Sequence, residues 1–458
     1  MSKHHGQVGL YPAELCNYNH QQQPGDRFGR LFPELPGLYT DPSVLAAVGA
    51  PGGPMEASGT VAELRTANVP VGHVFFGQFI DHDITLDVTS SLRAVNRPSA
   101  TTNVRTPTLD LDCVYGSGPE AHPFLYENSG SFKSAKLVVD DANDDLQRNA
   151  QGVAMIGDFR NDENRIVSQL QLGVIRLHNL FCDELAAAGY SGKELYEHAR
   201  EQTSWHYQWC VVHDFLSTMC GRDAVLDVLA NGRQYYRPSQ PFMPIEFSVA
   251  AYRFGHSMAP EAIQIQAGEP AHPLFAGFLG SFSPIGDPGE VVHWPELFAV
   301  PGSSATWQRA DKLDQKLAPL LLDLHVIDPS DERSLATRNL LRGQGFMLPS
   351  GEQVAALMGR GQHEIDEVSE AAADMHAGLA GATPLWLYIL LEGAEIGRGG
   401  DASAKGEGLG PVGGRIVAEV IIGLLECDER SWLSTNRAWS PANDRGTIAE
   451  LLHLSSPS

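Results

Sequence analysis

The segment Gly77-Gln78-Phe79-Ile80-Asp81-His82-Asp83 places an amide, two carboxylates and an imidazole in an otherwise apolar run. Apolar residues repeat around it with helical spacing, at Val71, Val74, Phe75, Phe79 and Ile80. We therefore predict a buried amphipathic helix over residues 71–84. On such a helix Gln78, Asp81 and His82 share one face. Because buried polar groups are costly unless they are paired or used, the segment indicates either a functional site or a polar cluster at a helix end.

The composition is that of a large acidic globular protein. The chain has 458 residues, of which 43% are hydrophobic and 19% charged, and its net charge is −24. An acidic surface repels phosphate, which argues against nucleic acid and anionic membranes as partners. The same surplus of carboxylates favours a hard cation such as Ca²⁺.

The sequence predicts neither a classical signal peptide nor a membrane span. No apolar segment follows the first six residues. The longest apolar stretches, at 384–391 and 417–425, are too short to cross a bilayer. We therefore expect a cytoplasmic protein, or one exported by a non-classical route. Its oligomeric state cannot be predicted from these patterns.

The domain organisation is expected to be an arm followed by one large body. Residues 1–60 are rich in Pro and Gly and poor in periodicity, so we expect loops wrapped over the body. The body, residues 61–458, has few strand patterns and several helical ones. Beyond the first helix, helices are predicted at 158–185, 207–216, 244–258, 349–358, 383–392 and 415–427. The predicted fold class is mainly α, a single large helical domain with long loops and few short strands.

A second acidic segment lies at Thr106-Pro107-Thr108-Leu109-Asp110-Leu111-Asp112. In an extended segment, the carboxylates of Asp110 and Asp112 would point the same way. With hydroxyls and carbonyls from Thr106 and Thr108, they form a plausible oxygen cage for Ca²⁺. A solvated loop is the alternative interpretation.

Three further pairs of polar residues share predicted helix faces: Arg160 with Glu163, Arg253 with His256, and Asn339 with Arg342. Each could be a structural pair that contributes little. Gly255, directly before His256, costs about 1 kcal/mol relative to Ala inside a helix, which close approach of a bulky group would justify. The chain has no HExxH and no Cys/His cluster for zinc. Two histidines and two arginines can instead form a haem pocket.

These motifs, in this order, resemble those of the animal-type haem peroxidases, in the peroxidase–cyclooxygenase superfamily. The resemblance spans roughly residues 60–440, and its motifs lie at 77–83, 110–116, 157–163, 177–179, 252–256 and 339–343. It implies a compact bacterial-type member that contains haem b. Such an enzyme uses H2O2 to oxidise small donors or halides and pseudohalides (bromide, iodide, thiocyanate, phenols) through a ferryl intermediate.

The resemblance implies a catalytic role for three residues. His82 resembles the distal histidine, a general base that takes a proton from H2O2 and returns it to the departing oxygen. Arg160 resembles the distal arginine, which stabilises developing negative charge. Gln78 matches a distal amide that hydrogen-bonds water or halide.

The resemblance also implies how the haem is held. His256 resembles the proximal ligand of the haem iron, and Asn339 would accept the other ring N–H of His256. Arg253 would pair with a haem propionate, and Arg342, in the motif of Asn339, is expected to bind the cofactor as well. Asp81 and Glu163 match two carboxylates that family members esterify to haem methyls, which implies covalently attached haem.

Two substitutions relative to other members follow from the same resemblance. Asn164 stands where one mammalian member has a methionine linked to haem, so that third bond should be absent. The residues that match the Ca²⁺ ligands are Asp83, Thr106, Thr108, Asp110 and Asp112. Asp112 stands where many members carry Ser, and its added charge should tighten Ca²⁺.

Two alternative functions remain open at this point. Fatty-acid dioxygenases of the superfamily carry a tyrosine three residues before the proximal histidine. Here that position is Arg253, and Tyr252 lies four before His256, which favours the peroxidase. The second alternative is a non-catalytic protein that binds haem or calcium.

Overall fold

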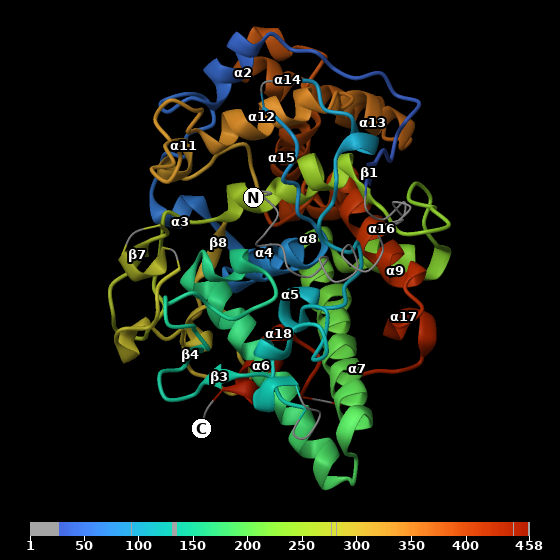
Figure 1. The fold of residues 1–458 in the computed structure, drawn as a ribbon. Helices are drawn as coiled ribbons and strands as arrows, with labels where there is room; N and C mark the ends of the chain where they lie inside the picture. Colours follow the sequence, from blue (N-terminus) through green and yellow to red (C-terminus); the bar gives the residue numbers. More distant parts are fainter. Residues whose placement is uncertain are drawn as a thin grey trace.

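The computed structural model describes residues 27–456 except 93, 131–134, 276, 281 and 443. Helices dominate the described part of the chain, and the predicted mainly α fold is confirmed (Figure 1). Much of the predicted arm, residues 1–26, lies outside the described residues. Within residues 27–60 the structure adds a helix where loops were expected, α2 (Pro42–Gly49), which packs against α12 (Leu335–Gly345).

The helices differ widely in length. The longer ones, besides α2 and α12, are α4 (Gly72–Ile84), α6 (Arg165–Ala187), α7 (Gly192–Cys210), α9 (Arg222–Asn231), α14 (Gln362–Met375), α15 (Leu385–Glu395), α16 (Pro411–Cys427) and α18 (Ile448–Ser455). The shorter ones are α3 (Val61–Leu64), α5 (Asp112–Tyr115), α8 (Ser217–Cys220), α10 (Gly255–Met258), α11 (Pro319–Leu322), α13 (Gly351–Leu357) and α17 (Trp432–Thr435). No helix among the described residues is long and apolar enough to cross a membrane.

The described strands are short and form separate pairs. The pairs are β1 (Phe28–Gly29) with β5 (Met243–Pro244), β2 (Arg65–Pro70) with β8 (Arg309–Asp311), β3 (Val139–Asp140) with β4 (Asp145–Leu146), and β6 (Ala262–Ile263) with β7 (His272–Pro273). Only the first pair is parallel.

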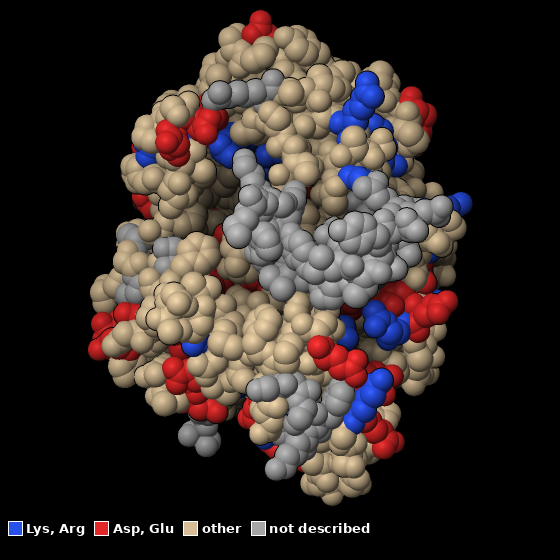
Figure 2. Space-filling view, in the orientation of Figure 1, with Lys and Arg blue, Asp and Glu red and all other residues tan. Residues whose placement is uncertain are grey.

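Charged side chains of both signs are interspersed over the face seen in Figure 2.

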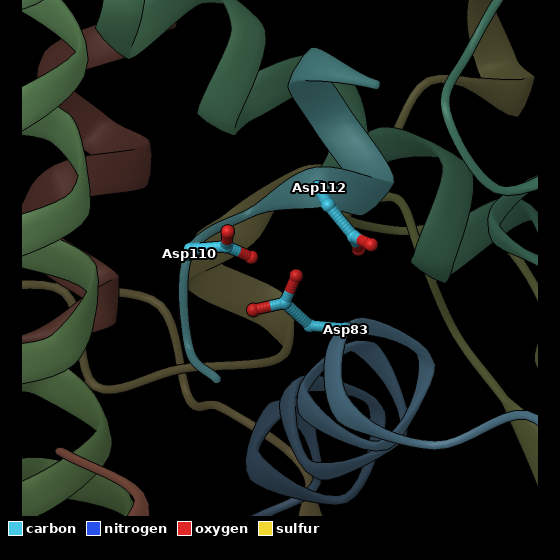
Figure 3. Close-up of side chains that lie close together, drawn as sticks. All are labelled: Asp83, Asp110 and Asp112. Atoms are coloured by element: carbon cyan, nitrogen blue, oxygen red, sulfur yellow. The ribbon is translucent and has the colours of Figure 1, made fainter. Parts of the chain in front are cut away.

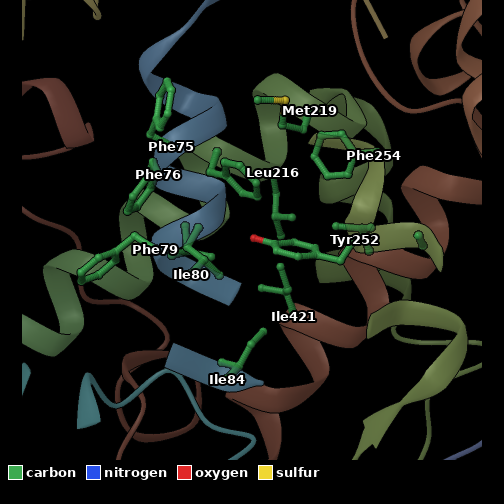
Figure 4. Packing of buried hydrophobic residues seen from close by; sticks show 14 of the residues in the cluster. Phe75, Phe76, Phe79, Ile80, Ile84, Leu216, Met219, Tyr252, Phe254 and Ile421 are labelled. Carbon is green, nitrogen blue, oxygen red and sulfur yellow. The ribbon is translucent and has the colours of Figure 1, made fainter. Parts of the chain in front are cut away.

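Helix α4 lies in the core, as its apolar spacing predicts. Phe76, Phe79 and Ile80 are completely buried, and Figure 4 shows them packed around the helix together with Tyr252 and Ile421. Burying a side chain of this size contributes about 1.5–3 kcal/mol. This packing fixes the rotation of α4 and therefore the direction of its polar residues.

Helix α6 begins later than the sequence predicts. Asp158 caps a 3₁₀ turn, η5 (Phe159–Asp162), by accepting a hydrogen bond from Arg160 N. Asn164 then caps α6 itself and accepts from Ile166 N. The two caps divide the predicted helix in two, and the turn between them places Arg160 and Glu163 beside α4.

The helix predicted over 244–258 is broken into three pieces. A π-helical turn, η7 (Glu246–Ala250), is followed by a 3₁₀ turn, η8 (Ala251–Phe254), and then by α10. The break falls at Ala250, whose φ of −126° and ψ of −77° are not helical. π-Turns inside helices occur frequently at functional sites, and this one directly precedes the segment that carries Arg253 and His256.

Candidate active site

Helix α4 and turn η5 bring three of the predicted site residues together. Gln78 donates from Nε2 to Oε1 of Glu163 at 2.8 Å. The same Oε1 lies 3.6 Å from Nε2 of His82, whose side chain is 6% exposed. Burial and the Arg160 charge lower the pKa of His82 to about 3. His82 is therefore a neutral imidazole at neutral pH, able to accept a proton.

Arg160 is anchored beside His82. Its Nε and Nη2 both donate to the carboxylate of Asp158. Nη2 also donates to the carbonyls of His82, at 3.0 Å, and Thr85, at 2.8 Å. Although burial opposes it, Arg160 and Arg105 lower the pKa of Asp158. The arginine is thus held as a fixed positive charge next to the end of α4.

The two carboxylates predicted to bond to haem lie near this charge. Burial raises the pKa of Asp81, while Arg160 and Arg253 act to lower it. Burial likewise raises the pKa of Glu163, although its side chain is 39% exposed. Thr85 donates its hydroxyl to Asp81 Oδ1 at 2.8 Å, so Asp81 is oriented by its own helix end.

Two buried amides behind His82 were not predicted. Nδ1 of His82 lies 2.7 Å from Oδ1 of Asn161, and Asn161 Nδ2 donates to Oε1 of Gln171 at 2.8 Å. The only sequence signal was a polar residue at position 171 in the apolar helix α6. That helix is buried on all sides over residues 165–175, so its polar residues need internal partners.

A second group of predicted residues gathers around His256. Asn339 donates from Nδ2 to Nδ1 of His256 at 2.8 Å, and its Oδ1 accepts from Arg253 Nη1 at 2.8 Å. The family resemblance implies the opposite amide orientation, with Asn339 accepting from His256. The reason for the difference is Arg253, because a guanidinium only donates and takes the amide oxygen.

Electrostatics in this second group are governed by burial. Burial, helped by Arg253, lowers the pKa of His256 to about 3. Burial also lowers the pKa of Arg253, to about 10. Arg342, predicted to bind the cofactor, forms an ion pair with Asp87 in which Nη1 lies 3.4 Å from Oδ2. Its charge helps to lower the pKa of Arg253, and among the described residues it makes no hydrogen bond to His256.

Helix contacts join the two groups. Helix α10, which carries His256, packs against α4, and the hydroxyl of Tyr252 donates to the carbonyl of Gly77 at 3.2 Å. Figure 4 shows the Tyr252 ring directed toward α4. A Cβ built on Gly255 would meet no heavy atom within 4 Å. Open space therefore lies beside Gly255, the residue that precedes His256.

The residues fit haem. A neutral, half-buried histidine can ligate iron through one ring nitrogen while the other is held by an amide. His256 and Asn339 provide this pair, and the open space at Gly255 lies next to it. Arg253 would supply a cation for a propionate, and two carboxylates lie beside His82: Glu163 through its 3.6 Å contact, and Asp81 as the preceding residue of α4.

A separate acidic cluster, the three-aspartate group, consists of Asp83, Asp110 and Asp112. Their carboxylate oxygens lie within 4.8 Å of one another, and Figure 3 shows all three pointing into one space between the end of α4 and the turn before α5. Oδ1 of Asp83 and Oδ1 of Asp110 are buried without a hydrogen-bond partner among the described residues. Burial and the other two carboxylates raise the pKa of Asp83 well above its ordinary value. Such a group fits a hard cation.

The turn that carries two of these aspartates is not the extended segment that the sequence predicts. Leu111 has a φ of 59°, which lies in the left-handed backbone region that residues other than Gly rarely adopt. This turn, not strand alternation, directs Asp110 and Asp112 to one space. Thr108 is buried with an unpartnered hydroxyl, whereas Thr106 is exposed and its carbonyl accepts from Thr108 N.

Arg105, also not predicted, links the three-aspartate group to Arg160. Its Nη1 lies 3.0 Å from Oδ1 of Asp112 and its Nε lies 2.9 Å from Oδ2 of Asp158. Burial and the neighbouring carboxylates, offset in part by Arg105, raise the pKa of Asp112 to about 7. The extra negative charge at Asp112 thus has its own buried counter-charge.

Comparison with known proteins gives matches in sequence and in fold. A family model described as animal haem peroxidase matches residues 90–360. Human thyroid peroxidase is 26% identical over 200 residues, which cover 43% of this chain and 21% of the relative. The match thus spans about a fifth of the length of that relative.

Solved structures share the fold at low sequence identity. Peroxidase A from Dictyostelium discoideum has a TM-score of 0.63 at 14% identity, over 94% of this chain and 96% of the other. The fatty acid alpha-dioxygenase of Arabidopsis thaliana has a TM-score of 0.59 at 16% identity, over 95% and 76% of the two chains. The Oryza sativa fatty acid alpha-dioxygenase scores 0.57 at 18% identity, over 95% and 78%. The family model covers more than half of the chain, and the matched residues include the turn η5, the segment that carries His256 and the motif that carries Asn339. This protein therefore belongs to the animal haem peroxidase family.

Proposed function

We propose that this protein is a haem peroxidase that uses H2O2 to oxidise small donors, among them bromide, iodide, thiocyanate and phenols. The observation that carries the proposal is the group around His82: a neutral imidazole, an anchored arginine, and an amide that shares Glu163 with the imidazole. These are the parts that heterolysis of a peroxide bond needs, namely a proton acceptor and a positive charge.

The proton chemistry falls to His82. Nε2 takes a proton from the bound peroxide and gives it to the oxygen that leaves as water. Arg160 stabilises the negative charge that develops on that oxygen, and Gln78 orients a water or halide nearby. Haem, when bound, supplies the electrons for cleavage and later regains them from the donor.

Haem would be held by residues on both sides of the proposed pocket. His256 is the proposed iron ligand, Asn339 its hydrogen-bonding partner, and Arg253 and Arg342 the cations near the propionates. Asp81 and Glu163 are the proposed ester-forming carboxylates. Haem b is therefore expected to be covalently bound.

Calcium would bind at the three-aspartate group. Asp83, Asp110 and Asp112 supply carboxylates, and Thr106 and Thr108 are the remaining proposed ligands. Thr108 supports the proposal through its buried hydroxyl, whereas exposed Thr106 would have to turn inward to contribute its side chain. Because Asp83 follows His82 in α4, the ion would brace the helix that carries the proton acceptor.

The decisive experiment is stopped-flow mixing of the haem-loaded protein with H2O2. We expect a rapid Soret shift in the wild type, and a rate of reaction with H2O2 that is about 10²- to 10⁴-fold lower in His82→Ala. Turnover is then measured with bromide, iodide, thiocyanate and guaiacol. Full haem occupancy with no peroxide turnover for any donor would leave the non-catalytic alternative.

A second candidate is a fatty-acid dioxygenase, which the similar fold and the burial of a tyrosine between the His256 segment and α4 favour. Tyr252 is buried and hydrogen-bonded to α4, next to Gln78. Oxygen uptake with linoleate that is robust and lost in Tyr252→Phe would replace the peroxidase proposal. We expect no such uptake, because the position three residues before His256 holds Arg253.

A further inference from the structure

A hydrogen-bonded chain runs from His82 to a backbone carbonyl through two amides. Oδ1 of Asn161 lies 2.7 Å from His82 Nδ1. Nδ2 of Asn161 donates to Gln171 Oε1 at 2.8 Å, and Gln171 Nε2 donates to the carbonyl of Cys113 at 3.2 Å. Asn161 and Gln171 are both completely buried, so water does not replace any of these bonds.

The Cys113 carbonyl fixes the direction of every hydrogen bond between it and His82. A carbonyl oxygen only accepts, so Gln171 must direct its NH2 toward Cys113 and its oxygen toward Asn161. Asn161 must then direct its NH2 toward Gln171 and its oxygen toward His82. Because an amide oxygen only accepts, Nδ1 of His82 must be the donor.

The opposite arrangement places like groups against each other. If Asn161 turned its NH2 toward His82, its oxygen would face the oxygen of Gln171. Turning Gln171 as well would bring its oxygen against the Cys113 carbonyl, which already accepts a hydrogen bond from Asp158 N. Buried polar atoms that lose their partners are costly, so only one direction satisfies every group.

We propose that Asn161 and Gln171 are positioning residues that hold His82 as the Nδ1–H tautomer, with a free lone pair on Nε2. A neutral imidazole carries one proton, so a proton on Nδ1 leaves Nε2 as an acceptor. Nε2 is the ring nitrogen that lies 3.6 Å from Oε1 of Glu163, the oxygen to which Gln78 donates. The inference rests on the proposed peroxidase function, because it names what prepares His82 to accept the peroxide proton.

The test compares ligands that bring a proton with one that does not. H2O2 and HCN must each give up a proton when they bind ferric haem, whereas CO binds ferrous haem without proton transfer. Association rates of all three are measured by stopped flow on the haem-loaded protein. For Asn161→Leu we expect the H2O2 and HCN rates to fall about 10- to 100-fold, the usual effect of losing such a partner, with the CO rate unchanged within about twofold.

Conservative and control variants separate positioning from folding. Asn161→Asp keeps an acceptor facing Nδ1, although its second oxygen faces Gln171 Oε1; it should raise the H2O2 and HCN rates above those of Asn161→Leu. Gln171→Leu should lower both rates less than Asn161→Leu, because Asn161 keeps its place but loses its fixed orientation. Gln169→Leu is the matched control: Gln169 is a buried amide of the same helix that donates to Asp144 O, and its loss should change none of the three rates.

The outcomes that overturn the inference are distinct from those that overturn the function. Equal losses for H2O2, HCN and CO in Asn161→Leu would mean altered access, and unchanged H2O2 and HCN rates would mean no control of the tautomer. Either result contradicts the inference about Asn161 and Gln171 but does not affect the proposed peroxidase function. If the wild type failed to react with H2O2 while HCN binding still depended on Asn161, the proposed function would fail and the positioning role would stand.

Discussion

Arg105 and Asp112 form a buried ion pair in which Nη1 lies 3.0 Å from Oδ1 and the side chains are only 3% and 12% exposed. The same guanidinium contacts Asp158, which in turn holds Arg160. One side chain thus balances the negative charge that Asp112 adds to the three-aspartate group. It also connects that group to the arginine beside His82.

Removal of Arg105 should make stability depend strongly on calcium. Breaking a buried pair by removing one partner costs about 3–5 kcal/mol, so Arg105→Met should lower the free energy of unfolding by this amount in chelator. Added Ca²⁺ should recover much of the loss, because the ion supplies the missing positive charge. The control is Arg176→Met, which removes an arginine paired with the more exposed Asp141 and Asp144 and should cost about 1 kcal/mol or less. Urea unfolding with and without Ca²⁺ measures both, and equal losses in the two conditions would contradict the prediction.

Calcium should stabilise the wild type and not a protein that lacks the three-aspartate group. A ligand present at one hundred times its dissociation constant adds about 2.7 kcal/mol to the free energy of unfolding. In Asp110→Asn we expect this increment to disappear, because a carboxylate with an unpartnered buried oxygen is lost. Melting temperatures with Ca²⁺ and with chelator provide the measurement. A wild type indifferent to chelator would argue against a calcium site here.

Covalent haem attachment should need at least one of the two carboxylates, Asp81 or Glu163. After incubation with H2O2, haem in the wild type should stay with the protein in acid–acetone. Asp81→Asn or Glu163→Gln should each retain it through the remaining ester, and the double variant should release it completely. Wild type never exposed to peroxide serves as the control, since its haem should be extracted. Release from peroxide-treated wild type would mean that the esters do not form.

The Asn339 side chain should tune the iron through His256. With Arg253 engaged by a propionate, the amide is free to turn its oxygen toward Nδ1 of His256, the orientation that the family resemblance implies. Asn339→Asp should then lower the Fe(III)/Fe(II) potential, because a stronger acceptor makes the imidazole a better donor to iron. Asn339→Leu should weaken haem binding about 10- to 100-fold. A spectroelectrochemical titration and haem-transfer kinetics would test these effects, and an unchanged potential in Asn339→Asp would count against the pairing.

Glu392 should make stability decrease as pH rises. Burial, offset in part by the amides of Val412 and Gly413, raises its pKa from an ordinary 4.5 to about 7. Between these values the folded protein keeps a proton that the unfolded chain releases, so the free energy of unfolding falls with rising pH, by up to about 3 kcal/mol. Glu392→Gln should flatten that part of the curve, and Glu395→Gln, on the same helix but more exposed, should not. Urea titrations from pH 4 to 8 would show the difference.

Local patterns predicted the helices better than they predicted the partners of buried polar groups. The apolar spacing around Phe79 was enough to predict α4 and the shared face of Gln78 and His82. The sequence contains no signal for the break at Ala250, because a single π-turn does not change the spacing of the apolar residues enough to be recognised. The sequence also predicted that Asp110 and Asp112 point the same way, but for the wrong reason, since a left-handed Leu111 replaces the extended strand.

Contacts between distant segments account for what the sequence could not predict. Arg105 meets Asp158 across 53 positions, and Asn161 meets His82 across 79. Neither residue falls on an apolar period, and although Asn161 lies in the motif 157–163, the resemblance assigned it no role. The orientation of Asn339 depends on Arg253, 86 positions earlier. Such pairs become apparent only when the helices are placed relative to one another.

The carbonyl of Cys113 has a consequence for folding. It accepts from Gln171 Nε2, 58 positions later in the chain, and closing such a loop is slow compared with forming a helix. Helix α4 could form early with His82 in either tautomer, because nothing within the helix chooses between them. Only when α5, which carries the Cys113 carbonyl, docks on α6 do the two amides acquire a fixed direction. The tautomer of His82 is therefore fixed only when the tertiary contacts form. A folding intermediate with native helices would still lack a single His82 tautomer.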